Sequence, residues 1–218
     1  MTQSGIFFYG RRIRFFGAHP DDIELGCGAL ISQVAPKTEI LCVTLSNNQA
    51  NQELPNLVKE HYASMEILGV PWENIVLGPF QTRRFPQARQ EILEYMLDFR
   101  RKFQPDIVFV HTRADIHQDH TTVTEEALRA FRGTTVLGFD VLRSSYGFFP
   151  SFLAEVSEDD VNRKIQALKS YHTYDNRYYF DPEVLRATLI RHGALAERPF
   201  AEGFDILRIV GRFGCINS

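Results

Sequence analysis

The stretch Ile13-Arg-Phe-Phe-Gly-Ala18 passes directly into His19-Pro-Asp-Asp-Ile-Glu24, and this junction indicates the fold. The first half is a short apolar run that ends in small residues, which is typical of a buried strand. The second half is a polar turn held by Pro20, and a helical pattern follows over Glu24–Val34. A buried strand that leads through a polar turn into a helix is the beginning of a βαβ unit.

The same alternation continues along the chain. Further strands are expected at Glu39–Leu45, Ile75–Leu77 and Asp106–His111, and further helices at Asn56–Leu68, Gln87–Phe103 and Thr121–Phe131. Strands that alternate with helices indicate a mostly parallel sheet with helices on both faces. We therefore predict an α/β fold, namely one Rossmann-like, doubly wound domain over residues 1–218. Its first four strands are expected in the order 3-2-1-4.

The pattern is less regular after Gly138. Strands are expected at Phe139–Leu142, Phe152–Val156 and Phe204–Val210, and helices at Asp159–Tyr171, with Ser157 as N-cap, and from Asp181 to about His192. No linker composition separates this region from the rest. The irregular C-terminal part from about residue 139 is therefore expected to complete the substrate site of the same domain.

Composition excludes several classes of protein. Hydrophobic residues make up 44% and charged residues 23% of the chain, which is typical of a globular domain. A net charge of −3 is too near neutral to indicate a nucleic-acid groove or a membrane-binding surface. No apolar run approaches the ~18 residues of a membrane span, and no secretory leader is evident. Three widely spread cysteines favour free thiols in a reducing compartment. We expect a cytoplasmic protein whose partners are small molecules.

A second polar loop, His111-Thr-Arg-Ala-Asp-Ile-His-Gln-Asp-His120, follows the fourth predicted strand. It collects three histidines and two aspartates, whereas the whole chain has 7 histidines. Imidazole and carboxylate groups are typical ligands of zinc and related metals. The alternative is a polar turn in which Asp119 caps the next helix. The metal interpretation is favoured because a solvated turn has no reason to gather so many imidazoles.

The first loop is ambiguous by itself. His19 and Asp22 lie three residues apart across a turn and can converge on one point. The alternative, which this loop alone favours, is that Asp21 and Asp22 form an N-cap pair. However, strands one and four are neighbours in a 3-2-1-4 sheet, and ligands bind at the carboxyl ends of strands at such a switch point. Both loops are therefore expected to meet in one crevice.

With AHPDDIE at Ala18–Glu24 and DIHQDH at Asp115–His120, the sequence resembles the LmbE-like, or PIG-L type, zinc-dependent N-acetylglucosaminyl deacetylases. A weaker match, Phe200-Ala-Glu-Gly-Phe204, lies near the C-terminus. The resemblance thus extends over nearly the whole chain, and it implies one Zn²⁺ per chain, with another divalent metal as the alternative. Related enzymes often form trimers or hexamers, so it also implies a homo-oligomer as one option.

The resemblance implies roles for particular residues. It implies that the metal ligands are His19, Asp22 and His120. It further implies that Asp21 is the general base, that a protonated His117 stabilises the oxyanion, and that Asp119 orients His117. Three protein ligands leave a metal position for water, which is the arrangement of catalytic zinc sites.

The implied activity is removal of the N-acetyl group from an N-acetylated amino sugar, as a nucleotide-linked or small-molecule-linked glycoside, by metal-activated water. One alternative is a zinc amidase that acts on a different acylated small molecule, such as an antibiotic or a thiol-cofactor conjugate. Another is an inactive metal-binding module. Intact Asp21 and His117 argue against the inactive module.

Substrate contacts are where the sequence departs from the family. Ser46–Glu53 stands where family members commonly carry a glycine-rich acidic stretch. Of the Arg-and-Glu pair that opens their next helix, Glu60 is in register but no arginine matches. The late motif begins with Phe200 instead of tyrosine. Expected substrate contacts are Arg113, Phe200, Glu202 and His172, the last standing where a His-Ser-Gln stretch is frequent. Arg83, Arg84 and Arg143 are weaker candidates for a phosphate contact, because solvated surface arginines are common, whereas Arg113 lies inside the metal loop.

Two other patterns have competing interpretations. The aromatic run Tyr171–Phe180 fits a platform for a sugar ring or simple core packing equally well. Gly26 and Gly28 faintly resemble a dinucleotide-binding loop, but they fall inside the predicted helix and lack a third glycine at the required spacing. We interpret these two glycines as sites of close helix–sheet packing, and Cys27 between them as a buried residue without a catalytic role.

Overall fold

The computed structural model describes residues 8, 10–48 and 54–211. Their strands form one seven-stranded sheet in the order β3-β2-β1-β4-β5-β7-β6. Strands β1 to β5 are parallel, and β7 runs antiparallel to both of its neighbours. The predicted α/β fold and the 3-2-1-4 order are confirmed. The strands are β1 (Arg12–Gly17), β2 (Glu39–Thr44), β3 (Ile75–Leu77), β4 (Ile107–His111), β5 (Thr135–Phe139), β6 (Phe152–Glu155) and β7 (Ala201–Arg208).

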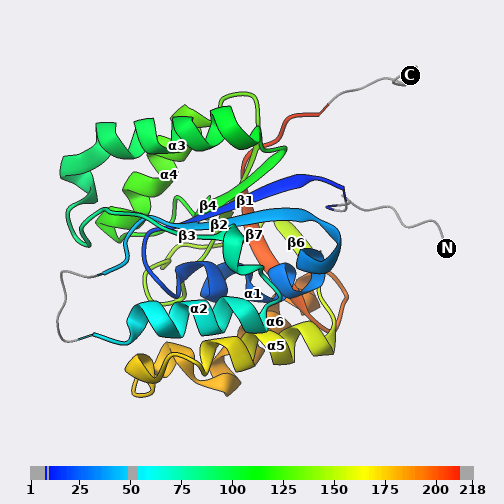
Figure 1. Cartoon of the computed structure of the whole chain (residues 1–218). Coiled ribbons are helices and arrows are strands. Elements are labelled where there is room, and N and C mark those ends of the chain that lie inside the picture. The colour runs from blue at the N-terminus through cyan, green and yellow to red at the C-terminus, as the bar shows by residue number, and fades with distance from the viewer. Residues whose placement is uncertain (1–7, 9, 49–53, 212–218) are drawn as a thin grey trace.

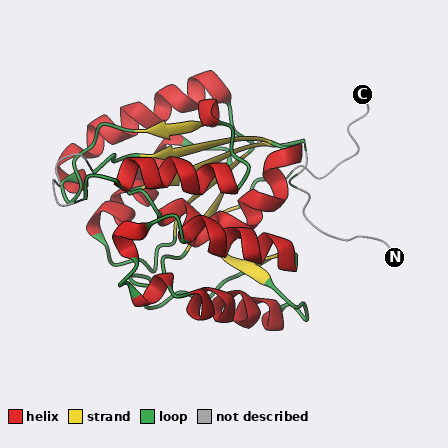
Figure 2. Cartoon of the chain, turned by 60° about the horizontal axis from the view of Figure 1, so that its bottom comes forward, coloured by secondary structure: helices red, strands yellow, loops and turns green. Residues whose placement is uncertain are grey.

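Helices cover both faces of this sheet (Figures 1 and 2). In Figure 1, α3 and α4 lie above the strands, and α1, α2, α5 and α6 lie below them. The described helices are α1 (Asp22–Val34), α2 (Leu57–Ile67), α3 (Arg89–Phe103), α4 (Gln118–Ala130), α5 (Glu158–Leu168) and α6 (Pro182–Leu195). None of them is long and apolar enough to span a membrane.

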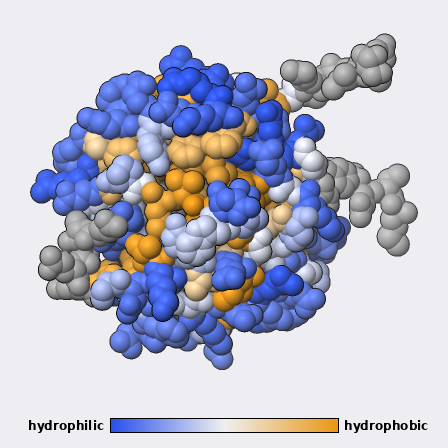
Figure 3. Space-filling view, in the orientation of Figure 1, coloured by the Kyte–Doolittle hydropathy of each residue, from blue (hydrophilic) through white to orange (hydrophobic). Residues whose placement is uncertain are grey.

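Side chains of β1 alternate between two hydrophobic cores. Phe15 packs in the core on the side of α1, and Phe16 packs in the core on the side of α3 and α4. Both rings are fully buried, and burying such a ring contributes about 1.5–3 kcal/mol. This explains why the predicted strand is apolar at consecutive positions, since a sheet covered on both faces has no solvent side. Figure 3 shows hydrophilic residues over the outer helices and apolar residues in the band between the two helical layers.

Helix α1 lies unusually close to the sheet. A Cβ atom on Gly26 would be 2.2 Å from the ring of Phe139, and one on Gly28 would be 3.0 Å from the side chain of Lys164. The interpretation as close helix–sheet packing is therefore confirmed for Gly26, whereas Gly28 packs against a neighbouring helix, because Lys164 belongs to α5. The close contact also fixes where α1 begins, directly after the first polar loop.

Several predicted boundaries are corrected. The fifth strand covers Thr135–Phe139 and not Phe139–Leu142, because the β-branched run after Gly133 pairs with β4, whereas residues after Phe139 turn away. The last strand begins at Ala201 instead of Phe204, since it pairs along the length of β6. The expected N-cap of α5 is confirmed, with Ser157 and Asp160 forming a capping box. Cys215 and most of Ser46–Glu53 lie outside the described residues.

Candidate metal centre

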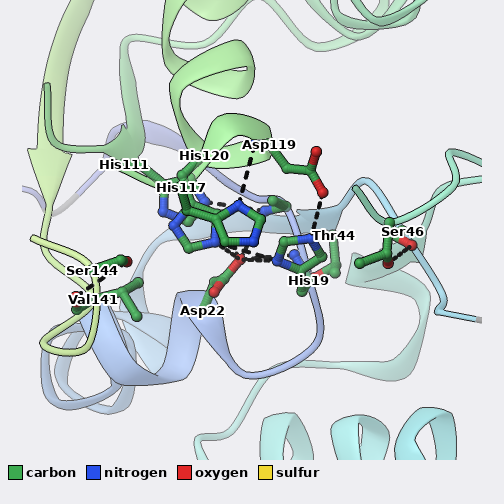
Figure 4. Close-up of polar contacts among 12 residues, drawn as sticks. His19, Asp22, Thr44, Ser46, His111, His117, Asp119, His120, Val141 and Ser144 are labelled. Carbon is green, nitrogen blue, oxygen red and sulfur yellow. Dashed lines mark hydrogen bonds and ion pairs between the residues drawn. The ribbon is translucent and has the colours of Figure 1, made fainter. Parts of the chain in front are cut away.

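The two polar loops meet at one edge of the sheet. The first connects β1 to α1, and the second connects β4 to α4. Because β1 and β4 are adjacent and parallel, both loops leave from the same edge while their helices cover opposite faces. Figure 4 shows the side chains of His19 and Asp22 facing those of His117 and His120 across this edge.

The three expected metal ligands form a compact triangle. His19 Nδ1 lies 3.4 Å from Asp22 Oδ2, His120 Nε2 lies 3.4 Å from the same oxygen, and the two nitrogens are 3.3 Å apart. In a tetrahedral zinc site with bonds of about 2.0–2.1 Å, neighbouring ligand atoms are about 3.3–3.4 Å apart. The spacing and the donor set therefore fit a zinc-sized ion with one position left open.

Each imidazole of the triangle is held by a buried carboxylate on its other nitrogen. His19 Nε2 is 2.9 Å from Asp119 Oδ2, and His120 Nδ1 is 2.8 Å from Asp115 Oδ2. Such carboxylate–histidine pairs fix the ring orientation of metal ligands. The carboxylate of Asp119 thus contacts the ring of His19, whereas its contact with the ring of His117 is made by the backbone N–H. Asp115 was not singled out from the sequence, although it begins the second motif.

Protonation of His19 follows from these carboxylates. Burial opposes a charged ring, but hydrogen bonds and charges from Asp119 and Asp22 outweigh it and raise the pKa of His19 to about 10. Burial would likewise raise the pKa of Asp22, but the surrounding histidines lower it. Without an ion, the cluster is thus a charged imidazolium between two carboxylates. A metal ion would replace that proton.

His117 begins helix α4. It occupies the N-cap position, and the backbone N–H of Asp119 donates to its Nδ1 at 3.2 Å. The alternative that Asp119 caps this helix is therefore not what forms. Burial and the charges of His120 and His19 lower the pKa of His117 to about 4, so the ring is neutral at neutral pH. Since Nδ1 accepts a hydrogen bond, the ring proton is on Nε2.

His111 lies next to the triangle and has a different role. Its ring stacks on that of His120 at 3.9 Å between centroids, and the backbone N–H of Ala18 donates to its Nε2 at 3.1 Å. Burial and the charge of His120 lower the pKa of His111 to about 3. His111 Nε2 is near Asp22 and His120, but its lone pair is already used. We therefore assign His111 to the support of the site.

Asp21 lies beside the triangle in an uncommon backbone conformation. Its φ is 105°, a region that residues other than glycine rarely adopt. It stands at the N-cap position of α1 without a side-chain capping bond, while Asp22 accepts from the backbone N–H groups of Ala18 and His19. The alternative of an N-cap pair is thus not what the structure contains. Burial and the charge of Asp22 raise the pKa of Asp21 well above its usual range, so this carboxylate readily takes up a proton.

Glu24, the last residue of the first motif, does not face the metal triangle. It is fully buried below α1, where its Oε1 lies 3.0 Å from His61 Nδ1 and accepts a hydrogen bond from Tyr171. Tyr171 therefore belongs to the core side of the aromatic run. Tyr174 and Tyr179 from the same run line the cavity above the metal triangle. The core-packing interpretation is therefore confirmed for Tyr171, and the sugar platform stays a prediction for Tyr174 and Tyr179.

A cavity of about 1070 Å³ opens above the metal triangle. Its walls come from the loop after β1, the turn after β3, the loops after β4 and β5, and the segment around η4 (His172–Tyr174) and η5 (Tyr178–Phe180). The irregular region after β5 thus contributes one wall. Such a volume is in the range of small-molecule binding sites.

The four substrate contacts expected from the sequence are not in the described lining of this cavity. Arg113 is exposed on the second loop, and His172 is exposed beside Asp175. The Phe200 ring packs under Arg186, with the guanidinium 5.5 Å from the ring centroid. Glu202 is buried because its side chain on β7 faces α1, and it pairs with Lys164 of α5 at 2.7 Å.

A doubly wound sheet with a His/Asp cluster at the carboxyl ends of its strands defines an α/β protein with a site that could hold a metal ion. The family model "GlcNAc-PI de-N-acetylase" (PIG-L) matches residues 14–131. Over 162 residues the chain is 32% identical to "Uncharacterized deacetylase YaiS" of Escherichia coli (strain K12), which covers 71% of this chain and 87% of that protein. The chain belongs to the PIG-L (LmbE-like) deacetylase family, and members of this family are generally metal-dependent.

Solved structures share the fold. The conserved protein TT1542 from Thermus thermophilus superposes with a TM-score of 0.77 at 23% identity, covering 93% of this chain and 97% of that one. The N,N'-diacetylchitobiose deacetylase from Pyrococcus horikoshii superposes with a TM-score of 0.73 at 18% identity, covering 90% of this chain and 84% of that one. At these identities the similarity establishes the architecture.

Proposed function

We propose that this protein is a zinc-dependent deacetylase that removes the N-acetyl group from an amino sugar, in a small-molecule or nucleotide-linked glycoside. The observation that carries the proposal is the triangle of His19, Asp22 and His120, whose spacing matches tetrahedral zinc, with Asp21 buried beside it. The P. horikoshii neighbour, named for its action on an acetylated sugar, supports a glycoside substrate.

Asp21 is the proposed general base. A bound zinc ion would supply Lewis-acid polarisation of the amide carbonyl and would lower the pKa of a water to about 7. Asp21 takes the proton of the attacking water, which its raised pKa favours. The same carboxyl group can then deliver that proton to the departing amine nitrogen. Acetate and the free amino sugar are the products.

His117 is the proposed donor to the reacting carbonyl oxygen. Because its Nδ1 accepts the N–H of Asp119, its Nε2–H is available to the cavity, and the neutral ring donates this hydrogen bond as negative charge develops on the oxygen. This refines the sequence-based hypothesis, in which His117 is protonated. Asp119 and Asp115 hold the two ligand imidazoles in place.

The proposal is tested by measuring acetate release from N-acetylglucosamine, its phosphate and nucleotide conjugates and small glycosides, with zinc added or chelated. We expect zinc-dependent release from at least one of these compounds. Zinc binding without acetate release from any of them would favour an inactive module. Release of a different acid from other amides, with the sugars untouched, would favour an amidase of another substrate class.

A further inference from the structure

Four arginines line the cavity above the metal triangle, namely Arg83, Arg84, Arg143 and Arg177. The acidic residues in the described lining are Asp21 and Asp22, which belong to the metal site. None of the four guanidinium groups forms an ion pair with a carboxylate of the described residues. The outer cavity is thus strongly cationic in a chain whose net charge is −3.

The arginines come from opposite sides of the metal triangle. Arg83 and Arg84 form the turn after β3, where the neighbouring Thr82 contacts Ser46 at 2.9 Å. Arg143 belongs to the loop that includes Ser144. Figure 4 shows Ser46 and Ser144 on opposite sides of the histidines, so the segments that carry Arg83, Arg84 and Arg143 approach the metal triangle from opposite sides.

Arg143 already has a local role. Its Nη1 donates to the hydroxyl of Tyr179 at 3.4 Å, its guanidinium lies 5.8 Å from that ring centroid, and its charge acts on Asp21. The guanidinium groups of Arg83 and Arg84 form no comparable contact with any of the described residues. Their charge is therefore available to a ligand.

The backbone of Arg83 is fixed to the metal site. Its φ is 67°, a left-handed conformation that is costly for an arginine. Its N–H donates to Asp119 Oδ2 at 2.5 Å, and its carbonyl oxygen accepts from the Gln118 side chain at 2.6 Å. The same Asp119 oxygen contacts the metal-ligand candidate His19. The turn is thus held at a defined distance from the reacting atoms, as a substrate-positioning element requires.

We propose that the Arg83–Arg84 turn is an oxyanion subsite, which binds a phosphate or carboxylate group carried by the N-acetylated amino sugar. This inference rests on the proposed function and adds a charged group to its substrate. Guanidinium groups present planar pairs of donors that match both oxyanions. An exposed Arg113 outside the cavity lining cannot supply this contact, whereas the turn after β3 faces the open space above the triangle.

The kinetic test compares three N-acetylated sugars that differ in charge: N-acetylglucosamine, its 6-phosphate and the carboxylate-bearing N-acetylmuramic acid. We expect the zinc-loaded protein to show kcat/KM at least ~10-fold higher for one of the charged sugars than for the neutral one. The double variant Arg83→Gln/Arg84→Gln should lose this advantage through KM, with kcat changed less than about threefold and the neutral sugar unaffected. Which charged sugar is preferred distinguishes phosphate from carboxylate.

Arg132→Gln is the matched control, because Arg132 is exposed at the other end of the sheet and outside the cavity lining. This variant should leave kcat/KM unchanged for all three sugars. Equal kcat/KM for neutral and charged sugars, or equal losses for all sugars in the double variant, would overturn the subsite.

A binding measurement separates this inference from the proposed function. Calorimetry on zinc-loaded Asp21→Asn protein, which is expected to bind without turnover, should show the same preference for the charged sugar and its loss in the arginine double variant. Absence of acetate release from every amide would refute the proposed function, whatever the binding shows. Acetate release with no charge preference in either measurement would refute only the subsite.

Discussion

The Nδ1 atom of His19 and the Nε2 atom of His120 lie 3.3 Å apart, although 101 residues separate them along the chain. The two rings arrive from adjacent parallel strands, and each is held from behind by its own carboxylate. The two nitrogens are therefore as close together as two neighbouring ligands of one tetrahedral zinc ion, which is the spacing that the proposed metal site needs.

Replacing His120 should abolish metal binding. His120→Ala removes one of the three donors, and the remaining two do not complete a zinc site. Elemental analysis should find about one zinc per wild-type chain and much less in this variant. His172→Ala is the control, since that histidine is exposed beside Asp175 and should keep its zinc content. Unchanged zinc in His120→Ala would remove this residue from the ligand set.

Asp115→Asn should weaken metal binding without removing a ligand. The carboxylate of Asp115 contacts His120 Nδ1 at 2.8 Å, and loss of such a partner typically costs ~10–100-fold in affinity. A chelator competition assay measures the change. Thermal melting without metal serves as a control, because Ser144 and Ser145 also donate to Asp115. An unchanged affinity would show that His120 needs no such support.

Asp21→Asn should keep the metal and lose turnover. The amide cannot accept the water proton, and general base catalysis typically contributes ~100–10,000-fold, so kcat should fall by an amount in this range. Zinc content should match that of the wild type because Asp21 is not in the ligand triangle. Asp159→Asn, on the exposed side of α5, provides a control with the same chemical change. Retention of most activity in Asp21→Asn would refute the base assignment.

Metal binding should release a proton at neutral pH. The pKa of His19 is raised from 6.5 to about 10 in the folded, metal-free chain. The stability that this group adds to the metal-free protein is therefore full below pH 6.5 and is lost as the pH rises through about 10. Because a metal ligand must be neutral, zinc affinity should increase with pH over this range. Calorimetry in two buffers with different ionisation enthalpies measures the released proton, and buffer-independent heats at neutral pH would contradict the assignment.

Glu202→Gln should lower stability. Glu202 accepts from Lys164 Nζ and from the backbone N–H groups of Ala29 and Leu30, all in the protein interior. Breaking a buried pair leaves an uncompensated charge and costs about 3–5 kcal/mol in the free energy of unfolding. Glu158→Gln, which breaks the surface pair with Arg186, should cost less than about 1 kcal/mol. Urea denaturation compares the two, and equal losses would contradict the structural role of Glu202.

The sequence contained enough to predict the architecture and the meeting of the two loops. Alternating apolar runs and helical patterns define a parallel sheet, and in such a sheet the carboxyl ends of β1 and β4 are neighbours regardless of side-chain detail. Residue pairs such as His120–Asp115 depend on side-chain conformations and were not predictable in the same way.

The cavity wall was the least predictable part. Arg113 lies inside the second polar loop but is exposed and outside the cavity lining, whereas Arg83 reaches the cavity from a turn after a strand of only three residues. That turn is placed by its hydrogen bonds to Asp119 and Gln118, which are tertiary contacts without a local sequence pattern. The fifth strand lies several residues before its predicted position, because Phe139 ends this strand instead of beginning it.

The positive φ of Asp21 sets a trade-off for engineering this protein. A glycine would adopt φ 105° without the cost, of about 1–3 kcal/mol, that an aspartate incurs there. The helix that follows cannot shift to relieve the turn, since Gly26 already lies against Phe139. A screen for heat-resistant variants that ignores turnover will therefore favour glycine at position 21, and it will enrich more stable proteins that have lost the proposed general base.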